Sequence, residues 1–116
     1  MKPFFTIAFI LASFTSDIKT ESFVNQWGDG VAVVQYNAVF NKTNSVKNLA
    51  RLSDARVFNA WIDTHPKLKE IGRVKSVPTI VIYKDGEEIR RWEAGISMKL
   101  DINYKDVQVY VDEVLK

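Results

Sequence analysis

The sequence predicts a single α/β domain in which helices cover both faces of a mixed β-sheet. Its 116 residues suffice for one compact core but not for two. Strand-like and helix-like segments alternate along the chain, and the last of them form a hairpin followed by a helix. The composition, 47% hydrophobic and 26% charged with a formal net charge of +2, is that of a globular protein. So small a charge does not indicate a nucleic-acid or membrane-surface binder.

The N-terminal segment has the layout of a secretory signal peptide, because Lys2 precedes an apolar run from Phe4 to Ala12 that small and polar residues follow. The run is too short to span a bilayer. No Ala-x-Ala cleavage site follows it, so a second interpretation stays open. We expect residues 1–16 to be a signal peptide or an apolar attachment strand, and residues 17–116 to form the domain. The first interpretation implies a periplasmic or secreted protein, and the second an intracellular protein or part of an assembled particle.

Four segments are predicted strands. Val31–Asn37 is nearly continuous in apolar residues, which indicates a central strand covered on both faces. Ala55–Asp63 alternates in side-chain character, and we interpret it as a second central strand. The run Thr79–Tyr83 and the segment from Ile89 to Trp92 flank an Asp-Gly turn, which predicts an antiparallel hairpin.

Four further segments are predicted helices. Thr20–Trp27 begins with a capping residue and places its apolar side chains on one face. The NKTN segment opens a helix that continues through Leu52. Pro66 lies in the first turn of a third helix, which Gly72 closes. Asn103 caps an amphipathic helix that ends the chain.

The hairpin carries a family resemblance. The segment VKSVPTIVIYKDGEEIRRWEAG joins a Val-Pro-Thr to an apolar strand, a Lys-Asp-Gly turn, a return strand and a glycine, and it resembles the second half of thioredoxin. The resemblance covers roughly Ile18 to Lys116 and implies the thioredoxin-like fold. It also implies a cis peptide bond between Val77 and Pro78, a bond geometry that is nearly confined to X-Pro.

The resemblance further implies that the redox motif of this family is replaced. The positions that match its Cys-x-x-Cys are Asn41, Lys42, Thr43 and Asn44, and the chain contains no cysteine. A carboxamide neither ionises to a nucleophile nor forms a mixed disulfide. Gln35 stands where the family has a buried aspartate, and Phe40 matches the aromatic before the first cysteine. We therefore expect a redox-inactive member, without catalytic residues, metal or cofactor.

A binding surface is expected where the family holds an extended substrate segment beside the proline. Its predicted residues are Asn41, Lys42, Thr43, Asn44, Ser76, Val77, Pro78, Gly95 and Ile96. Recognition by added strand requires main-chain hydrogen bonds and no catalysis. The expected partner is another protein or an extended peptide, with no nucleic acid involved. The alternative is a structural subunit of a larger assembly, for example a viral particle, in which the fold is a packing block.

The two asparagines of the NKTN segment also have local interpretations. Asn44 is a good N-cap for the helix predicted to follow it. Asn41 begins the sequon Asn-Lys-Thr, a glycosylation acceptor in a secreted eukaryotic protein, although such triplets also arise by chance. These interpretations and the binding surface remain open alternatives.

Overall fold

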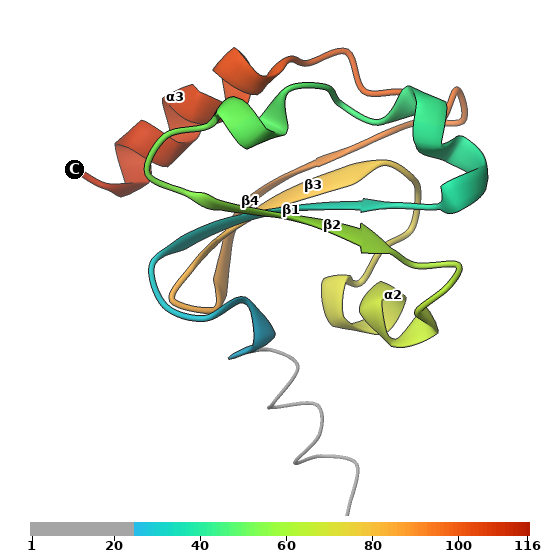
Figure 1. Cartoon of the computed structure of the whole chain (residues 1–116), viewed down its shortest axis with the longest axis horizontal. Coiled ribbons are helices and arrows are strands. Elements are labelled where there is room, and N and C mark those ends of the chain that lie inside the picture. The colour runs from blue at the N-terminus through green and yellow to red at the C-terminus, as the bar shows by residue number, and fades with distance from the viewer. Residues whose placement is uncertain (1–24) are drawn as a thin grey trace, which may run out of the picture.

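The structure is a computed structural model and describes residues 25–116. In this part of the chain a four-stranded sheet lies between two layers of helices (Figure 1). The strands, in the spatial order β2-β1-β3-β4, are β1 (Val31–Asn37), β2 (Arg56–Trp61), β3 (Thr79–Lys84) and β4 (Glu87–Glu93). β1 runs parallel to β2 and antiparallel to β3, and β3 and β4 form an antiparallel hairpin. The predicted three-layer sandwich with a mixed sheet and a C-terminal hairpin and helix is confirmed.

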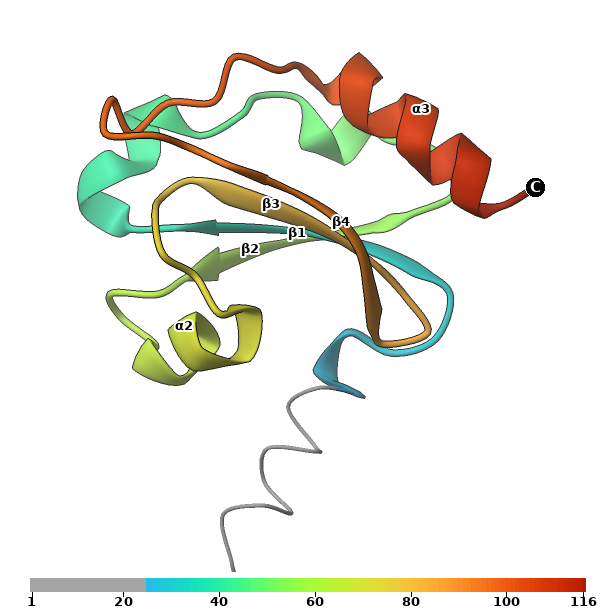
Figure 2. The ribbon, with the colours of Figure 1, turned by 180° about the vertical axis from the view of Figure 1, so that it is seen from behind.

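The helices of the described residues are short. They are the 3-10 helices η1 (Asn25–Trp27), η2 (Val39–Asn44) and η3 (Leu49–Arg51), and the α-helices α2 (Pro66–Gly72) and α3 (Tyr104–Val114). Figure 1 places α3 and η3 over one face of the sheet and α2 and η1 over the other, and the reverse view in Figure 2 agrees. Between residues 25 and 116, no helix has the length and hydrophobicity needed to cross a membrane.

Two predictions fall on residues that the structure does not describe. One is the signal peptide or attachment strand at residues 1–16. The other is most of the helix predicted at Thr20–Trp27, of which only Asn25–Trp27 is described, as the single turn η1.

The central strand β1 divides the core in two. All seven of its residues are buried, and alternate side chains face opposite helical layers. Tyr36 faces the α2 side and packs edge-to-face on Trp27, with ring centroids 6.3 Å apart. Val33 faces the other side, where it shares a core with Val107 and Val111 of α3. The prediction of a central strand at Val31–Asn37 is confirmed.

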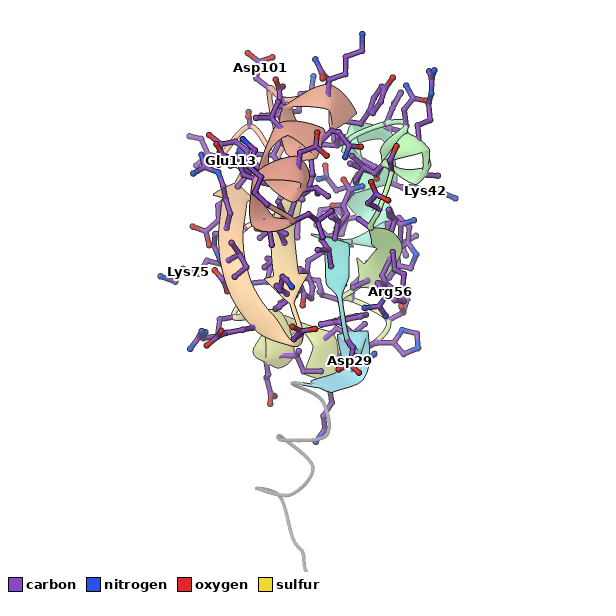
Figure 3. The ribbon with its side chains drawn as sticks, turned by 90° about the vertical axis from the view of Figure 1, so that its left-hand side faces the viewer. Asp29, Lys42, Arg56, Lys75, Asp101 and Glu113 are labelled. Atoms are coloured by element: carbon purple, nitrogen blue, oxygen red, sulfur yellow. The ribbon has the colours of Figure 1, made fainter. Side chains whose placement is uncertain are left out.

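The strand predicted at Ala55–Asp63 forms as β2, but within residues 25–116 it pairs with β1 alone and lies at the edge of the described sheet, so its central position is not confirmed. Of its six residues only Ala60 is buried. An edge strand has a neighbour on one side only, so polar side chains are tolerated along it. Arg56 illustrates this, because its guanidinium donates a hydrogen bond to the carbonyl of Asp29 beside it (Figure 3).

The helix predicted from NKTN through Leu52 does not form. η2 ends at Asn44 instead of beginning there, Ser45 is extended, and a single 3-10 turn follows. The side-chain amide of Gln35 binds both backbone groups of Val46, accepting from its N–H at 2.7 Å and donating to its C=O at 3.2 Å. Groups bound in this way cannot join a helical hydrogen-bond ladder. The predicted role of Asn44 as an N-cap is therefore also wrong.

The two α-helices begin as predicted. Pro66 is at the first turn of α2, and Asn103 caps α3 by accepting from the N–H of Asp106, whose carboxylate accepts from the N–H of Asn103 at 2.9 Å. The end of α2 differs, because Arg73 and not Gly72 adopts the left-handed conformation, with φ of 48°. A Cβ at Gly72 would lie 2.5 Å from Cζ of Tyr36, so the glycine permits close packing of α2 on β1.

Candidate functional site

A groove with a volume of about 690 Å³ lies where β1 runs into η2 and the chain enters β3. Its floor consists of buried apolar side chains, from Ala38, Val74, Val77 and Ala94. Its walls are apolar but exposed, because Phe40 is 71% exposed, Met98 38% and Ile96 fully. The other lining residues are Ile62, Asp63, Lys69, Lys75, Ser76 and Gly95. This size is within the usual range for a ligand site, roughly 300–1,000 Å³.

The backbone at the floor of the groove includes the cis peptide bond between Val77 and Pro78, which the resemblance predicted. The C=O of Pro78 accepts a hydrogen bond of 3.2 Å from the N–H of Ala94, so the two backbone segments that border the groove are joined. Among the hydrogen bonds within residues 25–116, none uses the N–H or the C=O of Val77. The backbone N–H and C=O of Val77 are therefore available to bind a ligand.

A network of hydrogen bonds joins three asparagine side chains next to the groove. Asn44 Nδ2 donates to Oδ1 of Asn41 at 2.7 Å, and Asn41 Nδ2 donates to Oδ1 of Asn37 at 3.1 Å. Asn37 Nδ2 in turn donates to the C=O of Asn41 at 3.1 Å and to Oγ of Ser45 at 3.0 Å. Buried amides satisfied in this way hold a loop in one conformation.

The same network joins the two exposed walls of the groove. Asn41 Nδ2 also donates to the C=O of Met98 at 3.1 Å. Asn41 directly follows Phe40, so this hydrogen bond ties the loop that carries Phe40 to the turn that carries Met98. Asn41 is only 4% exposed and its amide nitrogen makes two internal hydrogen bonds, so this folded structure does not accommodate a glycan on that nitrogen.

The nine residues predicted for the site are distributed over three environments. Four of them line the groove: Ser76, Val77, Gly95 and Ile96. Pro78 and Asn41 are buried and act through their hydrogen bonds to the groove segments. Three lie outside the lining: Lys42, Thr43 and Asn44. The structure thus joins the Ser76–Pro78 and Gly95–Ile96 segments and leaves the NKTN side chains outside the groove lining.

Sequence reasoning missed several groove residues. Phe40 had a signal, because it matches an aromatic position of the resemblance, yet it was not assigned to the binding surface. No sequence pattern pointed to Met98, Lys69 or Lys75. These residues line the groove only because the folded chain brings their segments together.

The charged side chains at the groove are two lysines and one aspartate. Asp63 Oδ2 accepts a hydrogen bond of 2.9 Å from the N–H of Val39, so its carboxylate is engaged. Within the described part of the chain, neither Lys69 nor Lys75 takes part in an ion pair. The groove therefore offers apolar contact, backbone hydrogen bonding and two ammonium groups.

The titratable groups with shifted pKa values lie elsewhere. Burial raises the pKa of Tyr36 and of Tyr83, whose hydroxyls are 2.7 Å apart. A hydrogen bond from Arg91 lowers the pKa of Glu88. None of these residues lines the groove. Across residues 25–116, no group of three or more His, Asp or Glu side chains is placed to hold a metal ion.

Solved structures similar to this chain include thioredoxins. A mutant thioredoxin from Halobacterium salinarum matches with a TM-score of 0.63 and 20% identity, over 84% of this chain and 85% of that one. Schistosoma mansoni thioredoxin matches with a TM-score of 0.59 and 19% identity, over 82% and 86%. Fasciola hepatica thioredoxin matches with a TM-score of 0.56 and 17% identity, over 84% and 92%. No protein-family model and no curated protein matches. The chain has a thioredoxin-like fold, and at these identities the likeness is one of fold alone.

Proposed function

We propose that the protein is a non-catalytic protein-binding module that holds an extended polypeptide in the groove beside Pro78. The observation that carries the proposal is the exposure of Phe40 and Ile96 at the rim of a groove with an apolar floor. Single exposed apolar side chains are ordinary, but several around one hollow are typical of an interaction site. A bound apolar side chain would cover these surfaces and the floor together, which makes binding favourable.

The bound segment lies in extended form along Val77. The N–H and C=O of this residue have no partner within residues 25–116, and an added strand requires such a pair of groups. The side chains of the segment alternate in direction, so one of them enters the groove while its neighbours point away. Main-chain hydrogen bonds then supply affinity, and the groove supplies selectivity.

The proposal assigns no thiol chemistry to the protein. The chain contains no cysteine, and the two positions that match the redox motif hold Asn41 and Asn44, whose side chains are hydrogen-bonded to each other. Thiol-disulfide exchange requires a thiolate that attacks a sulfur atom. In an insulin-reduction assay with dithiothreitol, we expect the same rate with and without the protein. Acceleration comparable to that by a thioredoxin control would contradict the redox-inactive assignment.

The binding proposal is tested by selecting phage-displayed random dodecapeptides on the protein. Enriched peptides are expected to shift the amide NMR signals of Val77, Gly95 and Ile96. Phe40→Ala should weaken their binding about tenfold or more, because a large apolar contact is lost. The control is Val109→Ala, a smaller truncation of an apolar side chain that is 56% exposed on α3, away from the groove.

Three outcomes would count against the proposal. They are a selection that enriches nothing over the Phe40→Ala protein, peptides that bind Phe40→Ala and the parent equally, and peptides that leave the Val77 and Ile96 signals unmoved. Each would show that the groove is not the binding surface.

A further inference from the structure

We infer that the occupant of the groove is an acidic extended polypeptide, in which carboxylates flank one bulky apolar side chain. The inference rests on the proposed function, because it specifies the ligand of that same groove. It is carried by the charges around the groove and by the shape of its apolar part.

The basic groups at the groove are free to bind a ligand. Lys69 of α2 and Lys75, which follows α2, line the groove and are exposed. Neither forms an ion pair with any residue in the part of the chain that the structure describes. Lys42 does not belong to this pair, because it lies outside the lining and projects to the opposite side of the molecule from Lys75 in Figure 3.

The acidic groups near the groove are already engaged. Asp63 Oδ2 accepts from the N–H of Val39 at 2.9 Å. Glu93, which precedes the groove residue Ala94, is 3.0 Å from Nη1 of Arg91 in an ion pair. Asp63 and Glu93 thus have partners within residues 25–116, whereas Lys69 and Lys75 form no ion pair there. The lining therefore carries two lysines against one aspartate, a formal charge of +1, and this excess has the sign that attracts carboxylates.

The apolar part of the groove accepts a large side chain. The volume of about 690 Å³ is bounded below by Val74 and Val77 and at the rim by Phe40, Ile96 and Met98. Aromatic and methionine walls adapt to aromatic or long aliphatic side chains. Because successive side chains of an extended segment alternate in direction, the residues next to the apolar one are directed out of the groove, towards the rim. Carboxylates at those positions reach Lys69 and Lys75.

The test uses three fluorescein-labelled decapeptides with a common central Val-Phe-Val, flanked by glutamates, glutamines or lysines. In 50 mM salt we expect the glutamate peptide to bind at least tenfold more tightly than the lysine peptide. Raising the salt to 500 mM should remove most of this difference, because exposed charges are screened. The double variant Lys69→Glu/Lys75→Glu should weaken binding of the glutamate peptide roughly tenfold and leave the glutamine peptide nearly unaffected.

The matched control is Lys47→Glu/Lys105→Glu, which makes the same change in net charge at a second hollow of the surface that these lysines line. It should leave the order of the three peptides unchanged. Equal affinities for the three peptides, or an equal effect of the two double variants, would overturn the acidic-ligand inference and leave the proposed function standing. If no peptide binds, or if Phe40→Ala binds all of them normally, the proposed function fails as well. A dimer in sedimentation that Phe40→Ala dissociates would identify a second copy of the chain as the occupant and overturn the inference.

Discussion

Asn44 Nδ2 donates a hydrogen bond of 2.7 Å to Oδ1 of Asn41. The resemblance matches these residues to the two cysteines of a thioredoxin motif, and the structure shows that their two carboxamides are bound to each other. The bond is one part of a larger network, because Asn41 also reaches the C=O of Met98 on the opposite wall of the groove. The side-chain hydrogen bonds of the asparagines therefore stabilise the conformation of this segment.

Truncating Asn41 should destabilise the protein. Asn41→Ala removes the hydrogen bonds to Asn37 and Met98 at a position only 4% exposed, and it leaves the Met98 carbonyl without this donor. We expect the free energy of unfolding to fall by about 2–4 kcal/mol in urea denaturation. The control Thr43→Ala, at an exposed position of the same loop, should change it by less than about 0.5 kcal/mol. A loss below about 1 kcal/mol for Asn41→Ala would show that the network contributes little.

Two glutamines with the same hydrogen-bond geometry should differ in importance. Gln35 binds the backbone of Val46 at 2.7 and 3.2 Å in the core, and Gln108 binds the backbone of Ser53 at 2.8 and 3.2 Å near the surface. Replacement by methionine keeps the length and removes the hydrogen bonds. We expect Gln35→Met to cost about 2–4 kcal/mol and Gln108→Met less than about 1 kcal/mol, because water can replace only the exposed partner. Equal losses in thermal or urea unfolding would refute this explanation.

Adding a methyl group at Gly72 should be poorly tolerated. Its Cβ would come within 2.5–2.8 Å of three ring atoms of Tyr36, which is fully buried. Gly72→Ala should therefore destabilise the protein by about 1–3 kcal/mol, despite the better helix propensity of alanine. Gly95→Ala is the control, because its Cβ would meet nothing within 4 Å. If Gly72→Ala were neutral in urea denaturation, α2 would have to move away from β1 at little cost.

The buried tyrosine pair should make stability fall in alkali. Burial raises the pKa of both Tyr36 and Tyr83 above the unfolded value near 10. Their contribution is fully present below about pH 10, and it declines above that because the unfolded chain loses protons that the folded chain keeps. Each tyrosine should add up to about 1.4 kcal/mol per pH unit to this decline. Urea midpoints from pH 8 to 11 should fall less steeply for Tyr83→Phe than for the parent, and parallel curves would contradict the prediction.

Local patterns allowed most of the fold to be predicted. The strands β1, β3 and β4, the Asp-Gly hairpin turn and the Asn103 capping box are each encoded in a few adjacent residues. The Val77-Pro78 peptide bond was correctly expected to be cis, on the strength of the resemblance. The resemblance also predicted that the Ser76–Pro78 and Gly95–Ile96 segments lie together, as they do at the groove, while their role in binding stays a prediction.

What the sequence determined by itself is the absence of any thiol, the order of the elements and the alternation that divides β1 between two cores. Only the tertiary structure decided that Gln35 binds the backbone of Val46 in place of a helix and that, among residues 25–116, β2 has β1 as its one neighbour. It also brought Lys69, Lys75, Phe40 and Met98 to one groove. The physical reason is the separation along the chain of the residues that interact. Capping, turns and alternation depend on neighbours in the chain, whereas a side chain that binds a distant backbone, or a wall built from three segments, depends on how the whole chain packs.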